Sequence, residues 1–290
     1  MTRALWLAWT FAALAGCGGP TDPAPKSDVY KRIVTFAPHL TELVFAVGAE
    51  EQLVGISAWS DYPPAALSLP VVGDAFSIDQ ERLALLNPDL LLVWQSGTPL
   101  HVIDELRMTG YTVESVRTRG LADVSAAMRR VGELTGQSTG ARRAAAAFDS
   151  ELQALRESNE GRAPIRVFYQ VSARPLYTVN REHYVSELIE ICGGTNIFDD
   201  LTELAPAVSV EAVVDRNPEV MLTSADAGDD GFAEWQRWPD IAANLYGNLF
   251  MLPADEIARA TPRLVIAGRA MCLALQKARS NRNTISGAGQ

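Results

Sequence analysis

The chain has 290 residues, of which 25 are Lys or Arg and 35 are Asp or Glu, so its formal net charge is −10 at pH 7. This acidic, otherwise ordinary globular composition argues against binding to nucleic acid or to anionic lipid, because both need clustered positive charge. Only three His and three Cys are present. That count excludes a Cys-rich zinc site and makes a His-rich metal cage hard to build.

The first 17 residues are expected to be an export signal. Arg3 is their only charged residue, and residues 4–15 are apolar except for Thr10. An apolar run of about 12 residues is typical of a secretory signal, whereas a membrane-spanning helix needs about 20. The run ends in Leu-Ala-Gly-Cys17, which is similar to the lipobox of bacterial lipoproteins, where the Cys is acylated and starts the mature protein. We predict lipidation of Cys17, and a plain signal peptide with an incidental Cys is the alternative.

Export makes the remaining cysteines informative. If Cys17 carries lipid, Cys192 and Cys272 are left as an even pair in an oxidising compartment. A disulfide between them is favoured over two buried free thiols.

Six segments follow one another along the chain. Strand-like apolar runs alternate with helical patterns in two stretches, which predicts parallel sheets covered by helices on both faces. Between these stretches lies a segment rich in strong helix formers, with four consecutive Ala residues. The predicted segments are a signal peptide (1–17), a flexible tether (18–30), an N-terminal α/β lobe (31–137), a bridging helix (138–160), a C-terminal α/β lobe (161–279) and a disordered tail (280–290).

The second lobe repeats features of the first. Glu81 precedes the string Asn87-Pro88-Asp89, and Glu211 precedes Asn217-Pro218-Glu219 at the same spacing. Thr-Glu-Leu-Val at 41–44 and Ser-Glu-Leu-Ile at 186–189 each precede a Gly at the same distance. Two matches in the same order indicate two similar lobes joined by one long helix.

Motifs of the common enzyme classes are missing from the sequence. There is no G-x-G-x-x-G, no G-x-x-x-x-G-K-[ST], no G-x-S-x-G and no H-E-x-x-H. Nothing therefore supports catalysis, and two exported lobes favour ligand capture in a cleft between them.

Aromatic residues stand where predicted strands end in loops. Because ligands of open α/β sheets bind at the carboxyl ends of strands, these side chains are candidates for contact with a large apolar ligand, although each could instead pack its own loop. They are Trp59, Phe76, Trp94 and Tyr177. His39 also follows the first strand, and either a place in the cleft or a solvated position fits it.

Glu81 and Glu211 each open a predicted helix. A carboxylate is favoured at a helix N-terminus, which explains either residue alone. Their matched places in the two lobes further indicate one carboxylate on each lobe tip, aimed at a symmetric partner.

Several stretches of the sequence, given below, resemble a known protein family. The chain is similar, from about residue 32 to residue 278, to periplasmic substrate-binding proteins with a rigid helical backbone, which serve ABC importers of vitamin B12, ferric siderophores and haem. It is most similar to the vitamin B12-binding branch. The resemblance rests on Ser60-Asp61-Tyr62-Pro63-Pro64, Glu81 with residues 87–90, residues 94–97, residues 190–198, Val208-Ser209 with Glu211, and residues 259–263.

The resemblance implies a fold and a set of roles. Two α/β lobes bridged by one long helix would hold a corrinoid between them, and Trp59 would stand at a ligand-contacting aromatic position. Glu81 and Glu211 would pair with arginines of the permease, and Cys192 with Cys272 would form the family's disulfide. A ligand-contacting loop would comprise Asp255, Glu256, Ile257, Ala258 and Arg259.

The sequence also departs from that branch. Ala75 stands where the branch has a Trp, and Glu256-Ile257 replaces an aromatic pair. A siderophore pocket usually presents several Arg or Tyr to an anionic complex, and only Arg174 and Arg259 are candidates here.

The sequence therefore predicts a monomeric, lipid-anchored protein at the periplasm or cell surface. It would deliver cobalamin or a related corrinoid to an ABC permease, with no cofactor, no metal site, no nucleic-acid partner and no catalysis. The alternatives are a ferric-siderophore or haem-binding protein of the same fold, and an exported enzyme or structural lipoprotein.

Overall fold

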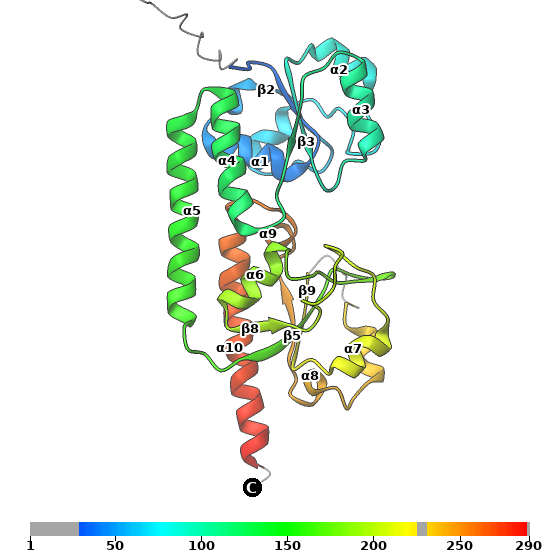
Figure 1. Cartoon of the computed structure of the whole chain (residues 1–290), viewed down its shortest axis with the longest axis vertical. Helices are drawn as coiled ribbons and strands as arrows, with labels where there is room; N and C mark the ends of the chain where they lie inside the picture. The colour runs from blue at the N-terminus through cyan, green and yellow to red at the C-terminus, as the bar shows by residue number, and fades with distance from the viewer. Residues whose placement is uncertain (1–28, 225–230, 289–290) are drawn as a thin grey trace, which may run out of the picture.

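Two four-stranded β-sheets lie in two lobes of the molecule (Figure 1). The computed structural model describes residues 29–224 and 231–288. The first sheet contains β1 (Ile33–Thr35), β2 (Leu53–Gly55), β3 (Leu90–Trp94) and β4 (Val113–Val116). The second contains β5 (Ile165–Gln170), β8 (Gly194–Asn196), β9 (Val220–Ser224) and β10 (Leu249–Leu252). Their orders are β2-β1-β3-β4 and β10-β9-β5-β8, and all paired strands in both are parallel, so the predicted α/β architecture is confirmed.

Helices cover both sheets, and this explains the strand sequences. Four consecutive residues of β3 are at most 1% exposed, as expected for a parallel strand buried on both faces: Leu90, Leu91, Leu92 and Val93.

A short antiparallel hairpin, β6 (Ser172–Ala173) and β7 (Leu176–Tyr177), follows β5. The helices of the N-terminal lobe are α1 (Pro38–Val47), α2 (Gln80–Leu86), α3 (Leu100–Met108) and α4 (Leu121–Thr135). Those of the C-terminal lobe are α6 (Tyr184–Ile191), α7 (Val210–Arg216), α8 (Ala242–Leu245), α9 (Ala254–Ala258) and α10 (Leu264–Ala288).

One long helix, α5 (Ser138–Asn159), runs along the side of both lobes (Figure 1). It buries Ala141, Ala145, Phe148 and Leu152, which recur at helical spacing and form a single apolar stripe. This stripe belongs to a continuous hydrophobic core that includes β1 and α1 of one lobe and β5, α6 and α10 of the other. The lobes are therefore joined by shared packing as well as by the chain.

The sequence repeat corresponds to a repeated local structure. Asp79 and Ser209 cap α2 and α7 by accepting from backbone N–H groups at 2.9 and 3.1 Å. Asn87 and Asn217 end these helices in the left-handed region, with φ of 43° and 42°. Asn tolerates this conformation better than most residues, which explains why the same residue stands at both sites.

The acidic residue after each Asn-Pro pair has a matching role in both lobes. Asp89 accepts from the backbone N–H groups of Lys31 and Arg32 at 2.8 and 2.9 Å, where β1 begins. Glu219 accepts from the backbone N–H of Arg166 in β5 at 2.9 Å. Each carboxylate thus ties the start of the strand that follows it, β3 or β9, to the first strand of its lobe, and the lobes are built alike.

The predicted disordered tail is wrong for residues 280–288, which continue α10. The reason is a set of long-range contacts: Arg282 pairs with Glu219 at 2.9 Å, and the Asn281 amide donates to Asn248 at 2.9 Å. Tertiary partners therefore extend a helix that its polar sequence does not indicate. The predicted signal peptide, with Cys17, and residues 18–28 of the predicted tether lie outside the described residues.

Candidate functional site

Three of the four candidate aromatic side chains are exposed at strand ends. Trp59 and Phe76, in N-terminal lobe loops, are 80% and 73% exposed, and Tyr177, at the end of β7 in the C-terminal lobe, is 37% exposed. Large aromatic surface left in water on both lobes is typical of a binding site. Both lobes therefore expose aromatic side chains among the residues that the sequence singled out, and their contact with a ligand stays a prediction.

Trp94 is different because it is half-buried and held by its neighbours. Its ring meets the His39 ring edge-on, with centroids 5.1 Å apart, and the close approach of its indole to Gly97 leaves no space there for a Cβ. His39 itself is 6% exposed, and burial lowers its pKa to about 3. His39 is therefore a neutral packing residue beside Trp94.

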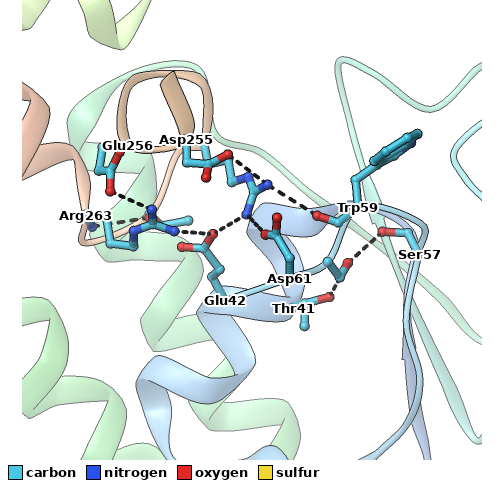
Figure 2. Close-up of polar contacts among 11 residues, drawn as sticks. Thr41, Glu42, Ser57, Trp59, Asp61, Asp255, Glu256 and Arg263 are labelled. Atoms are coloured by element: carbon cyan, nitrogen blue, oxygen red, sulfur yellow. Dashed lines mark hydrogen bonds and ion pairs between the residues drawn. The ribbon is translucent and has the colours of Figure 1, made fainter. Parts of the chain in front are cut away.

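A cluster of six charged side chains joins the lobes next to Trp59 (Figure 2). Arg259 contacts Glu42 at 3.0 Å, Asp61 at 2.6 Å and Asp255 at 3.1 Å. Arg263 contacts the same Glu42 at 3.1 Å and Glu256 at 2.7 Å. We call this set the inter-lobe cluster; its members are Glu42, Asp61, Asp255, Glu256, Arg259 and Arg263.

Glu42 is the buried centre of this cluster. Its side chain is 3% exposed and lies on α1, and both arginines lie just before α10 of the other lobe. Burial raises the pKa of Glu42, and the hydrogen bond from Arg259 offsets only part of that rise. For the half-exposed Asp61, the hydrogen bond from Arg259 lowers the pKa. A buried carboxylate shared by two guanidinium groups holds the lobes in one register.

The backbone beside the cluster is strained at Trp59. Its φ is 67°, in the left-handed region, which costs a bulky residue of order 1–3 kcal/mol. Four hydrogen bonds hold this segment. The Trp59 carbonyl accepts from the Asp61 N–H at 3.1 Å and from Arg259 Nη2 at 3.3 Å, and the buried Ser60 hydroxyl bonds the hydroxyls of Thr41 and Ser57 at 3.1 and 3.0 Å. Figure 2 shows the indole directed away from the carboxylates.

The predicted ligand loop, residues 255–259, is largely the short helix α9, which lies between the lobes (Figure 1). Asp255, Glu256 and Arg259 belong to the inter-lobe cluster, as given above. Ile257 is fully buried, and the Tyr184 hydroxyl donates to the carbonyls of Ile257 and Ala258 at 3.1 and 3.2 Å. The structure therefore does not bring the Ile257 side chain to the exposed aromatic surface.

A cavity of about 290 Å³ adjoins the cluster on the α1 side. Glu42, Tyr62 and Arg263 line it, and the Arg263 guanidinium lies 4.1 Å from the centre of the Tyr62 ring. Sequence reasoning gave no role to Glu42, Asp61 or Arg263. The available signal was one carboxylate inside the apolar helix pattern 40–47, which is unusual unless it is paired.

Glu81 and Glu211 are exposed in the first turns of α2 and α7. These helices lie in different lobes, on the side of the molecule away from α5 (Figure 1). Within the described part of the chain, neither carboxylate takes part in an ion pair. Both are thus available to an outside partner.

The disulfide Cys192–Cys272 is present, with the two Cα atoms 4.7 Å apart, so the favoured pairing is confirmed over two free thiols. It ties the end of α6 to α10. Among the helices of residues 29–224 and 231–288, none is long and apolar enough to cross a membrane. In the same residues, His, Cys, Asp and Glu side chains form no group of three or more that could hold a metal ion.

Comparison with known proteins gives consistent matches. Residues 33–256 match the family described as periplasmic binding protein. The vitamin B12-binding protein of Vibrio cholerae serotype O1 is 35% identical over 247 residues, covering 85% of this chain and 89% of that protein. A crystal structure of the periplasmic vitamin B12 binding protein BtuF of Vibrio cholerae superposes with a TM-score of 0.78 at 34% identity, covering 86% of this chain and 98% of that one.

A haem-binding relative shares the fold. The periplasmic heme-binding protein RhuT from Roseiflexus sp. RS-1 superposes with a TM-score of 0.75 at 23% identity, covering 86% of this chain and 98% of that one. The similar sheets, the long α5 and the match over most of the sequence lead to one conclusion. The chain belongs to the periplasmic binding protein family.

Proposed function

We propose that this protein captures cobalamin or a related corrinoid outside the cytoplasm and delivers it to an ABC permease. The observation that carries the proposal is 35% identity, over 85% of the chain, to a vitamin B12-binding protein. The exposed aromatic edges on both lobes agree with it, because a corrin ring presents a large, mostly apolar surface.

The ligand lies between the lobes in this proposal. Trp59, Phe76 and Tyr177 supply exposed aromatic surface, and Trp94 supports the N-terminal edge from its packed position. Polar contacts come from residues 255–259, among which Arg259 bonds the Trp59 carbonyl and Asp255 pairs with Arg259. A pocket that is already shaped loses less conformational entropy on binding.

The charge around Arg259 favours a corrinoid over an anionic iron chelate. Its guanidinium already faces Glu42, Asp61 and Asp255 within 3.1 Å, so it is neutralised before any ligand arrives. The other candidate cation, Arg174, is an exposed residue in the turn between β6 and β7. A ferric siderophore or haem would therefore meet more carboxylates than free cations here.

The protein reaches the membrane through lipid on Cys17 in this proposal, after export directed by residues 1–17. Mass spectrometry of the N-terminal peptide should show acylated Cys17, and Cys17→Ser should move the protein into the soluble fraction. A protein that stays bound to membranes after this substitution would contradict lipid anchoring.

Delivery uses Glu81 and Glu211, whose exposed carboxylates would pair with arginines of the permease. The protein performs no chemistry on its ligand, so a bound corrinoid should be recovered unchanged. Turnover of the ligand would instead favour an exported enzyme built on this fold.

Calorimetric titration of the full-length protein in detergent tests the ligand. Sub-micromolar binding of one cyanocobalamin per protein, with no binding of haemin or ferrichrome, is the expected result. Binding of an iron chelate without cyanocobalamin would move the protein to the iron-binding branch.

A further inference from the structure

Asp61 forms a link between the lobes that the proposed function leaves unused. It lies in the loop after β2, and its Oδ1 accepts from Arg259 Nη1 at 2.6 Å, although the two residues are 198 positions apart. The Asp61 side chain is 51% exposed, while that of Arg259 is 13% exposed. The Asp61 carboxylate therefore lies on the solvent side of a guanidinium group that is mostly buried.

The same guanidinium holds the backbone of Trp59. Arg259 Nη2 donates to the Trp59 carbonyl at 3.3 Å, and the backbone N–H of Asp61 donates to that carbonyl at 3.1 Å. The Trp59 ring is 80% exposed and its φ is 67°. Packing of the ring cannot impose this unusual conformation, so it is held by hydrogen bonds of the loop, among which the two to the Trp59 carbonyl act on the residue itself.

Arg259 is itself fixed from both lobes. Glu42 of α1 and Asp255 of α9 hold it at 3.0 and 3.1 Å. With its position set, the guanidinium acts as a rigid support to which Asp61 ties the loop carrying Trp59. Removing Asp61 would leave Arg259 anchored but would release one side of the loop.

We propose that Asp61 is a positioning residue that, through Arg259, holds Trp59 in the conformation that receives the ligand. The role of Trp59 as a ligand contact rests on the proposed function. The benefit is pre-organisation: a ring held in place before binding does not have to be ordered by the ligand.

The first test needs no ligand. The full-length protein is labelled with 5-fluorotryptophan, and the Trp59 resonance is assigned by its loss in Trp59→Phe. In Asp61→Asn, the Trp59 resonance should shift and broaden while the resonance of the buried Trp235 stays in place. Asp61→Glu, which keeps the charge, should restore the wild-type line shape at least in part.

Asp200→Asn is the matched control. Asp200 pairs with Arg216 at 2.6 Å and its side chain is 56% exposed, but this pair lies within the C-terminal lobe. It should leave the Trp59 resonance unchanged. A Trp59 resonance that is the same in Asp61→Asn as in the wild type would overturn the proposal.

The second test measures cyanocobalamin affinity in a double-mutant cycle. Asp61→Asn should weaken binding about 5–10-fold in the wild-type background and less than about 2-fold in Trp59→Ala, because residues that act through one another are not additive. Equal weakening in both backgrounds would overturn positioning through Trp59. If the wild type does not bind cyanocobalamin, the proposed function fails, and the Trp59 resonance still decides the role of Asp61.

Discussion

The two lobes share their frame and differ in the surfaces they present. α2 and α7 have the same length, the same kind of N-terminal cap and the same left-handed Asn at the end, and each carries one exposed glutamate in its first turn. The aromatic edges are unlike: Trp59 and Phe76 on the N-terminal lobe, and Tyr177 on the C-terminal lobe. The matching geometry of α2 and α7 suits a partner with two similar docking sites. The aromatic loops, which differ between the lobes, suit a ligand whose two sides differ.

Contacts across the lobe boundary also combine equivalent positions with different partners. Glu42 and Glu187 stand at matching places in the repeat, on α1 and α6, and each reaches the opposite lobe. Glu42 receives two arginine side chains, whereas Glu187 accepts from the backbone N–H of Leu121 at 3.1 Å, at the start of α4. Equivalent carboxylates thus bind different partners, so mutating each one tests a different contact between the lobes.

The matched glutamates on α2 and α7 give the largest expected effect. Glu81→Ala combined with Glu211→Ala should abolish uptake of cyanocobalamin while leaving affinity within about 2-fold, because charge pairs at an interface rim fix docking rather than ligand contact. Uptake in cells and titration of the purified protein check the two halves of this prediction. Wild-type uptake by the double variant would remove the docking role.

A disulfide joins α6 to α10 in the C-terminal lobe. In the N-terminal lobe, the corresponding helices α1 and α4 pack together with no disulfide between them. Replacing Cys192 and Cys272 together by Ala should lower the free energy of unfolding by about 4 kcal/mol, as chain entropy gives for a loop of 80 residues. Denaturant unfolding of the oxidised wild type and the double variant measures this loss. A loss below about 1 kcal/mol would mean that packing alone holds α6 against α10.

The two inter-lobe carboxylates should differ in their contribution to stability. Glu42→Ala leaves two guanidinium groups without their buried partner and should cost about 3–5 kcal/mol. Glu187→Ala removes one bond to a helix N-terminus and should cost about 1 kcal/mol. Denaturant unfolding checks both values, and equal losses would show that the two contacts are equivalent despite their chemistry.

The smallest expected difference between the lobes is in how His39 and His183 make the stability depend on pH. Burial lowers the pKa of His39 to about 3 and of His183 to about 4, whereas an unfolded His titrates near roughly 6.5. The unfolded chain therefore binds more protons as pH falls below that value, and each histidine should remove about 1–2 kcal/mol of stability between pH 6.5 and 5. The pH dependence should separate the two residues only below about pH 4.

Paired variants check this expectation. His183→Asn keeps a side chain that can cap α6, where His183 Nδ1 now accepts from the Val185 N–H at 3.2 Å, but it does not titrate. Denaturant unfolding of His183→Asn and His39→Asn at pH 7 and pH 5 should show a flatter pH dependence for each than for the wild type. An unchanged slope would mean that the residue is already exposed to protons in the native state.

The sequence predicted what local pattern determines. The helix at 138–159 has strong helix formers and no internal Gly after residue 140, and it forms over those residues. The Asn-Pro repeat marks a helix end followed by a strand, and it does so twice. The disulfide followed from counting cysteines in an exported chain.

Long-range partners were beyond such patterns. Glu42 and Arg259 are 217 residues apart, so no spacing rule pairs them, and the inter-lobe cluster became visible only in the fold. Ile257 was expected in a loop, but residues 254–258 form a helical turn that places its side chain in the core. Residues 280–288 stay helical because other parts of the chain bind them.

The core shared by the lobes and α5 also determines how the molecule can release what it holds. Pulling the lobes apart would bring buried apolar surface into water, and hydration of that surface opposes opening by roughly 25 cal/mol for each Å² exposed. Wide spontaneous separation of the lobes is therefore expected to be rare. Under the proposed function, the permease that docks on α2 and α7 would have to supply the work of separating the lobes to release the ligand.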